Sequence, residues 1–279
     1  VRVHDSIYSL ELFHGPTLAF KDVGARFMAR LLGYFIERKG NKEVNVLVAT
    51  SGDTGSAVAN GFLGVPGIHV YVLYPKGKVS EIQEKQFTTL GRNITALEID
   101  GTFDDCQALV KSAFMDKDLN KMMNLTSANS INVARFLPQS FYYFYAYAQL
   151  LKQGMADNIV MCVPSGNFGN ITAGLFAKRM GLPVRRFIAA NNRNDIFLQY
   201  LRSGKYEPKP SVSTLANAMD VGAPSNFARI LDLYGGSHDA VCAEISGASY
   251  TDEQIRETLA DVYRRCHYLL DPHGTCGYR

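Results

Sequence analysis

Several features that would place the chain in a common class of protein are missing from its sequence. The five cysteines are odd in number and form no C-x-x-C pair, so neither a disulfide framework nor a zinc site is expected, and no metal ligand is predicted. The net charge is only +3, from 29 Lys and Arg against 26 Asp and Glu, which argues against nucleic acid or a membrane surface as partner. No apolar run could cross a bilayer and no signal-peptide pattern opens the chain, so we expect a cytoplasmic protein.

The length and the apolar content limit the size of the core that the chain can form. With 279 residues, of which 47% are hydrophobic, the chain can bury one large core or two smaller ones. No repeat or low-complexity tract interrupts it. It begins with Val1 and stops at Arg279 without an evident helix cap, so we expect a fragment of a longer protein.

Two parts of the sequence predict the same order of strand, glycine loop and helix. Residues 44–62 contain a β-branched run, the loop SGDTG and a helical stretch, and residues 158–180 repeat this order around the loop SGNFGN. Apolar residues at helical spacing over residues 22–37 predict a helix with one buried face. Further strands are expected at residues 69–74, 94–99 and 184–190. This alternation favours an α/β fold with parallel sheets.

The segment FHGPTLAFKD at residues 13–22 places a lysine at the start of the first predicted helix. The helix dipole disfavours a positive charge there, so the amine of Lys21 is suited to attack a carbonyl. From these residues alone, a surface lysine whose stem covers Phe20 is the more common arrangement. The wider segment is needed to decide between the two.

Residues 10–25, LELFHGPTLAFKDVGA, resemble the lysine segment of threonine synthases, which are fold-type II pyridoxal-phosphate enzymes of the tryptophan synthase β-like group. The resemblance runs from about Leu10 to the end of the chain. It implies that Lys21 is catalytic and forms the Schiff base with pyridoxal 5′-phosphate. It also implies two α/β units with parallel-rich sheets and the cofactor in the cleft between them.

The resemblance also implies a domain organisation. Residues 1–43 and 136–279 would form the larger, cofactor-binding unit, and residues 44–135 the smaller, movable unit. An N-terminal domain and a C-terminal end found in the family are expected to be missing. The missing end would carry the Ser or Thr that hydrogen-bonds the pyridine nitrogen, so this partner cannot be named within the chain.

Residues 49–55, ATSGDTG, are similar to the loop that holds the substrate carboxylate in fold-type II enzymes. Glycines let such a loop turn its N–H groups inward, and hydroxyl groups add further donors. Position 53 usually carries Asn, which hydrogen-bonds the 3′ oxygen of the cofactor, whereas Asp is typical of this branch of threonine synthases. The resemblance implies a cofactor contact from Asp53 and substrate contacts from Thr50, Ser51, Gly52 and Thr54. Taken alone, the motif also fits an ordinary turn with a hydroxyl helix cap.

The loop at residues 165–170, SGNFGN, is expected to bind the phosphate of the cofactor. Successive N–H groups followed by a helix N-terminus suit a doubly charged anion. The spacing fits neither G-x-x-x-x-G-K-[ST] nor G-x-G-x-x-G, which excludes a P-loop and a dinucleotide fingerprint. The predicted cofactor ligands here are Ser165, Gly166, Asn167, Phe168, Gly169 and Asn170.

Residues 129–135, NSINVAR, resemble the threonine synthase segment that binds the substrate phosphate. Arg135 can grip a phosphate through two parallel N–H bonds, with Asn129 and Asn132 as neutral donors beside it. A loop with a solvated arginine is the simpler interpretation of these residues alone. Residues 214–227, TLANAMDVGAPSNF, also look like a family signature, to which we assign no role.

The function that the resemblance implies is threonine synthase: O-phospho-L-homoserine and water become L-threonine and phosphate, in the last step of threonine biosynthesis. The enzyme would be a carbon–oxygen lyase acting on phosphates, a monomer or homodimer. One alternative is another fold-type II reaction, such as threonine or serine dehydration or cysteine synthesis. A second alternative is a catalytically inactive anion-binding or regulatory module. The presence of Lys21 argues against it.

Overall fold

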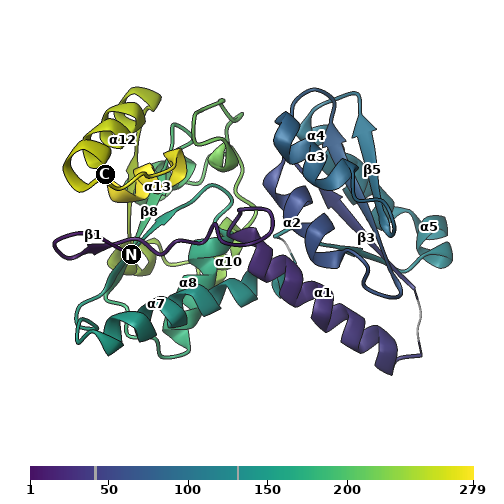
Figure 1. The fold of residues 1–279 in the computed structure, drawn as a ribbon, viewed down its shortest axis with the longest axis horizontal. Coiled ribbons are helices and arrows are strands. Elements are labelled where there is room, and N and C mark those ends of the chain that lie inside the picture. Colours follow the sequence, from purple (N-terminus) through teal and green to yellow (C-terminus); the bar gives the residue numbers. More distant parts are fainter. Residues whose placement is uncertain (41–42, 131) are drawn as a thin grey trace. The chain divides into compact units, whose positions relative to one another are not determined.

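The computed structural model describes residues 1–40, 43–130 and 132–279, and the chain divides into two compact units (Figure 1). Unit 1 comprises Val1–Leu10 with Gln139–Arg279, and unit 2 comprises Glu11–Pro138. Each unit has its own parallel sheet and its own buried core. The predicted α/β fold with two parallel-sheet units is therefore confirmed.

Unit 2 is built around a four-stranded parallel sheet in the order β5-β4-β3-β6. Its elements, in chain order, are α1 (Lys21–Arg38), β3 (Val44–Ala49), α2 (Asp53–Phe62), β4 (Ile68–Pro75), α3 (Glu81–Thr88), β5 (Ile94–Ile99), α4 (Phe103–Met115), α5 (Lys117–Met122), β6 (Leu125–Ser127) and α6 (Val133–Phe136), and η1 (Leu137–Gln139) follows at its edge. The strands and helices predicted in this region are confirmed, and α2 begins earlier than expected because the end of the glycine loop joins the helix.

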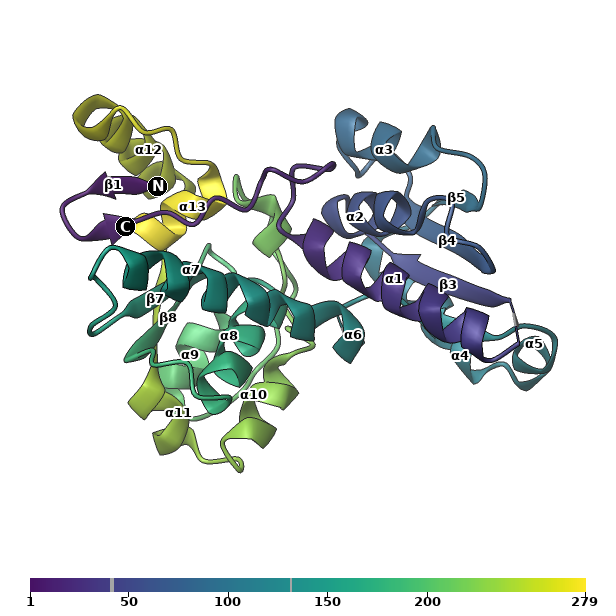
Figure 2. The same ribbon diagram turned by 60° about the horizontal axis from the view of Figure 1, so that its bottom comes forward.

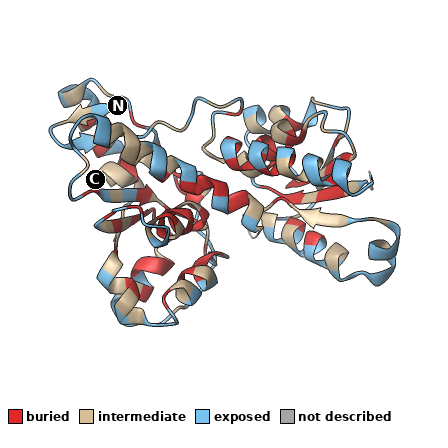
Figure 3. Ribbon diagram, turned by 90° about the horizontal axis from the view of Figure 1, so that it is seen from below, coloured by how far each residue is buried: buried red, intermediate tan, exposed pale blue. Residues whose placement is uncertain are grey.

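Helices cover both faces of this sheet (Figure 2). Buried residues of α1, α2 and α3, among them Met28, Phe62 and Phe87, pack with the inward residues of β3 and β4. On the opposite face, Cys106 and Val110 of α4 pack against the other side of the same strands. Nearly all residues of the central strands β3 and β4 are buried or half-buried (Figure 3), which explains the nearly continuous apolar sequence of these two strands.

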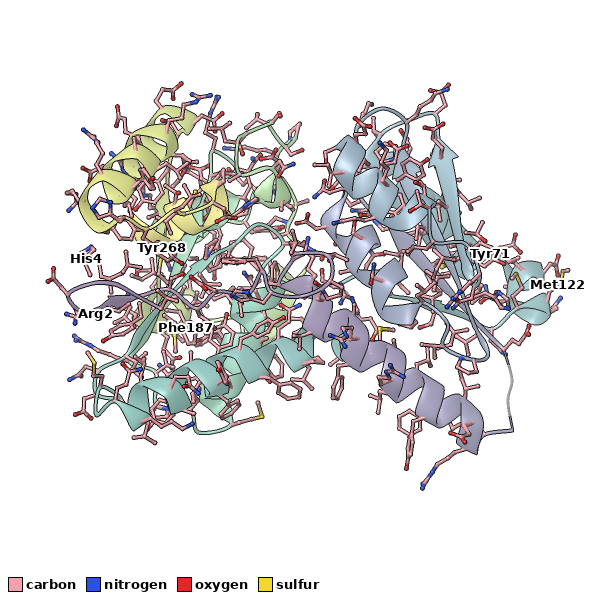
Figure 4. All side chains as sticks on the ribbon, in the orientation of Figure 1. Arg2, His4, Tyr71, Met122, Phe187 and Tyr268 are labelled. Carbon is pink, nitrogen blue, oxygen red and sulfur yellow. The ribbon has the colours of Figure 1, made fainter. Side chains whose placement is uncertain are left out.

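Unit 1 contains a three-stranded parallel sheet in the order β7-β8-β9 and a short antiparallel pair at its N-terminus. Its elements are β1 (Arg2–His4), β2 (Ile7–Tyr8), α7 (Ser140–Lys152), β7 (Val160–Pro164), α8 (Gly169–Arg179), β8 (Arg186–Asn191), α9 (Ile196–Ser203), η2 (Asn217–Met219), α10 (Phe227–Leu233), α11 (His238–Glu244), β9 (Ile245–Ser249), α12 (Asp252–Cys266) and α13 (Pro272–Tyr278). Phe187 of β8, labelled in Figure 4, is fully buried and lies edge-on to Tyr143 of α7, with ring centroids 5.9 Å apart. The predicted strands in the regions of β7 and β8 are confirmed.

Residues 11–40 group with unit 2, since α1 packs closely against α2. The sequence analysis assigns residues 1–43 to the larger unit and treats 44–135 as the movable one. Which residues move together as a body stays a prediction. Within the described part of the chain, no helix combines the length and the apolar character that crossing a bilayer requires.

Candidate active site

Lys21 is the first residue of α1, and a buried carboxylate fixes the backbone around it. The Asp22 side chain accepts hydrogen bonds from the Thr17 N–H at 3.0 Å and the Thr17 hydroxyl at 2.6 Å. Asp22 is only 3% exposed. These bonds fold the preceding segment back onto the first turn of α1, so the lysine starts from a defined position.

The amine of Lys21 faces the carboxylate of Asp53, the first residue of α2. The Lys21 Nζ and Asp53 Oδ2 atoms are 3.5 Å apart, and the two side chains are 19% and 25% exposed. A carboxylate is favoured at a helix N-terminus, which suits Asp53. The structure thus brings together the predicted catalytic lysine and a predicted cofactor ligand from two separate motifs.

Thr50 holds the loop between β3 and α2 in one shape. Its hydroxyl accepts hydrogen bonds from the N–H groups of Gly52 at 2.9 Å and Gly55 at 2.8 Å, and donates to the Gly52 carbonyl at 3.0 Å. Gly52 has a φ of 143°, a conformation that favours glycine. Thr50 is 1% exposed, so its predicted substrate role stays a prediction while its structural role is direct.

The same loop presents donors that could hold an anion. The N–H groups of Ser51, Asp53 and Thr54 have no hydrogen-bond partner within the part of the chain that the structure describes. They lie at the N-terminus of α2, where the helix dipole adds to their attraction for negative charge. This arrangement can bind a carboxylate, as the sequence predicts.

Asn129 and Asn132 use their amide groups to shape the chain that follows β6. The Asn129 amide donates to the Ala49 carbonyl at 2.8 Å and accepts from the Ala49 N–H at 3.3 Å, as a neighbouring strand would. Asn132 caps α6, accepting from the Ala134 N–H at 3.0 Å, and donates to the Ser127 carbonyl at 2.8 Å. Their predicted role as phosphate ligands stays a prediction.

Arg135 is a buried residue that connects the end of β6 with the start of α1. It is 2% exposed, and its Nε donates to the Ala128 carbonyl at 2.7 Å. Its Nη1 donates to the carbonyl of Lys21 at 3.1 Å. The sequence predicts a phosphate ligand, whereas the geometry gives Arg135 a direct part in holding the backbone of the lysine.

Gln83 of α3 was not predicted from the sequence, although it contacts the site directly. Its Nε2 donates to Asp53 Oδ1, and its Oε1 accepts from the Ser80 hydroxyl at 3.0 Å. The sequence around it, Ser80-Glu-Ile-Gln83, has the S-x-x-Q spacing of a helix capping box. That pattern predicts helix capping and gives no sign of the contact with Asp53.

In unit 1, the loop at residues 165–170 is held at both ends. The Asn191 amide donates to the Ser165 carbonyl at 2.7 Å, and the Asn170 amide donates to the Pro164 carbonyl at 2.6 Å. Tyr143 donates to the Asn170 carbonyl at 2.8 Å. Burial raises the pKa of the Tyr143 hydroxyl, so it stays protonated and remains a donor.

This loop directs unpaired N–H groups at one place, the N-terminus of α8. Those of Gly166, Phe168, Gly169 and Asn170 find no hydrogen-bond partner among residues 1–40, 43–130 and 132–279. Phe168 takes the left-handed conformation, with a φ of 62°, which turns the chain there. A Cβ on Gly166 would lie 2.5 Å from the Cα of Met219, so only glycine fits this close approach. The loop can therefore bind a phosphate.

The signature at residues 214–227, which sequence reasoning left without a role, supports this loop. Asn167 Oδ1 accepts from the Ser225 N–H at 2.7 Å and from the Ser225 hydroxyl at 3.0 Å. The Asn226 amide donates to the Asn167 carbonyl at 2.9 Å. Asn167, a predicted cofactor ligand, is thus held on both sides by this segment.

Asp220 organises the first half of the same signature. It accepts from the Thr214 hydroxyl at 2.7 Å and from the Asn192 amide at 2.8 Å. Burial raises the pKa of the Asp220 carboxyl even though these hydrogen bonds favour its charged form. The segment is tied to the residues that follow β8, and these bonds fix the position of η2 behind Gly166.

Comparisons with known proteins agree with this geometry. Threonine synthase from Haemophilus influenzae is 50% identical over 278 residues, which are 100% of this chain and 64% of the relative. The crystal structure of threonine synthase from Escherichia coli matches with a TM-score of 0.90 and 49% identity, over 100% of this chain and 64% of that one. A pyridoxal-phosphate-bound threonine synthase from Brucella melitensis matches with a TM-score of 0.91 and 38% identity, over 100% and 65%.

These matches confirm the resemblance to threonine synthases and the fold-type II architecture. The chain spans 64% of the length of the first relative. A family model described as pyridoxal-phosphate dependent enzyme matches residues 3–279. With nearly every residue inside that match, the chain belongs to the family of pyridoxal-phosphate dependent enzymes.

Proposed function

We propose that the complete protein is a threonine synthase, which converts O-phospho-L-homoserine and water to L-threonine and phosphate. The observation that carries this proposal is the Lys21–Asp53 pair, 3.5 Å apart at the starts of α1 and α2, in a chain 50% identical to a named threonine synthase. Because the chain spans 64% of that relative, we assign the activity to the complete protein.

The residues present fit pyridoxal 5′-phosphate. The four unpaired N–H groups at the start of α8 suit its phosphate, and Gly166 lets the loop pass close to the backbone of Met219. Ser165 and Asn167 complete the proposed phosphate loop, and Asp53 is the proposed partner near the ring. When bound, the cofactor supplies an electron sink that eases the breaking of bonds at Cα and Cβ of the substrate.

Lys21 is the proposed attachment residue and the proposed general base and acid. Its Nζ would take and return protons at Cα and Cβ, since an amine released from the cofactor stays within reach of both carbons. The backbone of Lys21 is held by Arg135 and the following residue by Thr17, so the amine has a fixed starting point. Asp53 beside the amine provides a counter-charge whenever the amine carries a proton.

Two anion sites are proposed for the substrate. The carboxylate would bind the unpaired N–H groups of the loop after β3, with the hydroxyls of Ser51 and Thr54 as further donors and Thr50 and Gly52 shaping it. The distal phosphate would bind near Asn129, Asn132 and Arg135. Arg135 already donates through Nε and Nη1 to two carbonyls, which would hold its guanidinium in place for such a contact.

Because Arg135 donates to two backbone carbonyls, one second candidate function is a fold-type II dehydratase acting on threonine or serine. Such substrates carry no distal phosphate, so a buried Arg135 that holds the backbone of Lys21 would suit them. Cysteine synthesis is compatible for the same reason. The 50% identity to a threonine synthase weighs against both.

Assays on the complete protein with its cofactor decide between these functions. O-phospho-L-homoserine should yield threonine and phosphate in equal amounts, and Lys21→Ala should abolish both. Formation of 2-oxobutyrate from threonine at a comparable rate would overturn the proposal and support the dehydratase. The expected cytoplasmic location and monomeric or homodimeric state stay predictions, which cell fractionation and analytical ultracentrifugation can test.

A further inference from the structure

Gln83 departs from the pattern of its own helix start. Ser80 caps α3 by accepting from the Gln83 N–H at 3.4 Å, and in a capping box the Gln83 side chain would return to the Ser80 N–H. Its Oε1 instead accepts from the Ser80 hydroxyl, and its Nε2 donates to Asp53. At the same position of α12, the Gln254 side chain accepts from the Thr251 N–H at 2.9 Å and completes the box.

The contact with Gln83 determines how Asp53 can face Lys21. Asp53 Oδ1 accepts from Gln83, while Oδ2 is the atom 3.5 Å from the Lys21 amine. A carboxylate held at one oxygen cannot turn its other oxygen away without breaking that hydrogen bond. Each side chain of the pair is at least three-quarters shielded from water, with 19% of Lys21 and 25% of Asp53 exposed, which strengthens the interaction between the charges.

Gln83 is itself docked against the loop that carries Asp53. The Ser56 hydroxyl donates to the Gln83 carbonyl at 3.2 Å. A Cβ on Gly52 would lie 2.3 Å from Gln83 Oε1, so the loop and the side chain fit closely. The amide therefore has little freedom to leave Asp53.

We propose that Gln83 is a positioning residue for the Lys21 amine, acting through Asp53. It holds the carboxylate so that one oxygen faces Nζ. This inference rests on the proposed function only for the catalytic role of Lys21, because the contacts among the three residues do not depend on it.

The first test is made on the complete protein after removal of its cofactor. Acetic anhydride acylates only neutral amines, and peptide mass spectrometry gives the rate at Lys21 relative to the exposed Lys205 in the same sample. Removing a nearby opposite charge favours the neutral amine, so Asp53→Ala should raise this rate by about threefold to tenfold. Gln83→Met, which keeps the length of the side chain, should also raise it, by about twofold to fivefold.

A double-mutant cycle separates positioning from packing. If Gln83 acts through Asp53, Gln83→Met should change the Lys21 rate by less than about 1.5-fold when Asp53→Ala is already present. Gln254→Met, which removes the matching glutamine of α12, should leave the Lys21 rate unchanged.

Equal effects of Gln83→Met in both backgrounds would overturn the proposal and make Gln83 a packing residue of α3. The absence of any effect of Gln83→Met in the wild-type background would also overturn it. Borohydride labelling of another lysine would reject the proposed attachment site, while the acylation cycle would still test the contact of Gln83 with Asp53 and Lys21.

Discussion

Thr17 and Asp22 are joined by two hydrogen bonds, from the backbone N–H and from the hydroxyl of Thr17, inside a region where Asp22 is 3% exposed. The pair closes the segment before α1 into a turn that ends at Lys21. The sequence presents Asp22 only as part of a family segment, whereas the structure makes it the residue that fixes the backbone next to Lys21. Its removal is therefore expected to affect stability and cofactor attachment together.

Asp22→Ala should lower the free energy of unfolding by about 2–4 kcal/mol, because it leaves a buried N–H and a buried hydroxyl without an acceptor. Urea unfolding followed by circular dichroism measures this. Asp118→Ala is the matched control, since Asp118 also lies in the first turn of a helix but its side chain is 88% exposed; it should change stability by less than about 0.5 kcal/mol. Equal losses in the two variants would contradict the role given to Asp22.

Lys21 should be the residue that borohydride reduction links to the cofactor. Its amine lies beside Asp53 within the family's attachment segment, and reduction makes a covalent link between an amine and a carbonyl permanent. Peptide mapping of the reduced complete protein should find the label on Lys21, and Lys21→Ala should carry none. Lys76→Ala, at an exposed lysine after β4, should be labelled like the wild type. A label elsewhere in the wild type would reject the assignment.

Arg135→Met should destabilise the protein by about 2–4 kcal/mol, since the carbonyls of Ala128 and Lys21 would lose a charged donor inside a buried region. The free energy of unfolding tests the structural part of this statement. The KM for O-phospho-L-homoserine tests the proposed contact with phosphate. A large rise in KM with unchanged stability would make Arg135 a substrate ligand whose backbone contacts matter little.

Asn226→Ala should weaken cofactor binding by about tenfold, the effect of losing one or two hydrogen bonds that hold the phosphate loop. Asn226 is fully buried, and its amide donates to Asn167 and accepts from Arg229. Fluorescence titration of the cofactor-free protein measures the dissociation constant. The control is Asn120→Ala, because the exposed Asn120 also donates to main-chain carbonyls but lies in unit 2. A similar loss of affinity in the control would refute the prediction.

The thiol of Cys276 should be inert at pH 8. Burial raises its pKa to about 12 from 9.0, so only roughly one molecule in ten thousand carries the reactive thiolate at that pH. The rate of labelling by iodoacetamide should therefore keep rising above pH 9. The half-buried Cys266 provides the comparison, and Cys266→Ser identifies its share of the signal. Rapid labelling of Cys276 at pH 8 would show that α13 opens away from its unit.

The strand–loop–helix units were predictable because β-branched runs and glycine loops are local signals. Residues 44–62 and 158–180 became β3-loop-α2 and β7-loop-α8 almost as expected. The strands β6 and β9 were not predicted. The sequence of β6, LTS, is too short to show the alternation of a strand, and the residues of β9, ISGAS, are mostly too small to show it. Their place in the sheets comes from pairing with distant strands, which a single sequence does not reveal.

The residues of the candidate site likewise divide into those that local motifs predict and those that only the structure reveals. Motifs located Lys21, Asp53 and the two anion loops, because each is continuous in sequence. Gln83 forms a hydrogen bond with Asp53, thirty positions away in the sequence, while the residues around Gln83 indicate only a helix cap. The sequence predicts that Arg135 faces a ligand, which stays a prediction, and gives no sign of its hydrogen bond to the carbonyl of Lys21, 114 positions away. Contacts of this kind depend on tertiary packing rather than on local composition.

The Thr50 hydroxyl has a consequence for the thermodynamics of binding. It fixes the loop through Gly52 and Gly55 without any ligand, so the conformational entropy of these residues is lost during folding. An anion that reaches the N–H groups of Ser51, Asp53 and Thr54 then orders little further backbone. More of the attraction between the anion and these donors is consequently retained as affinity.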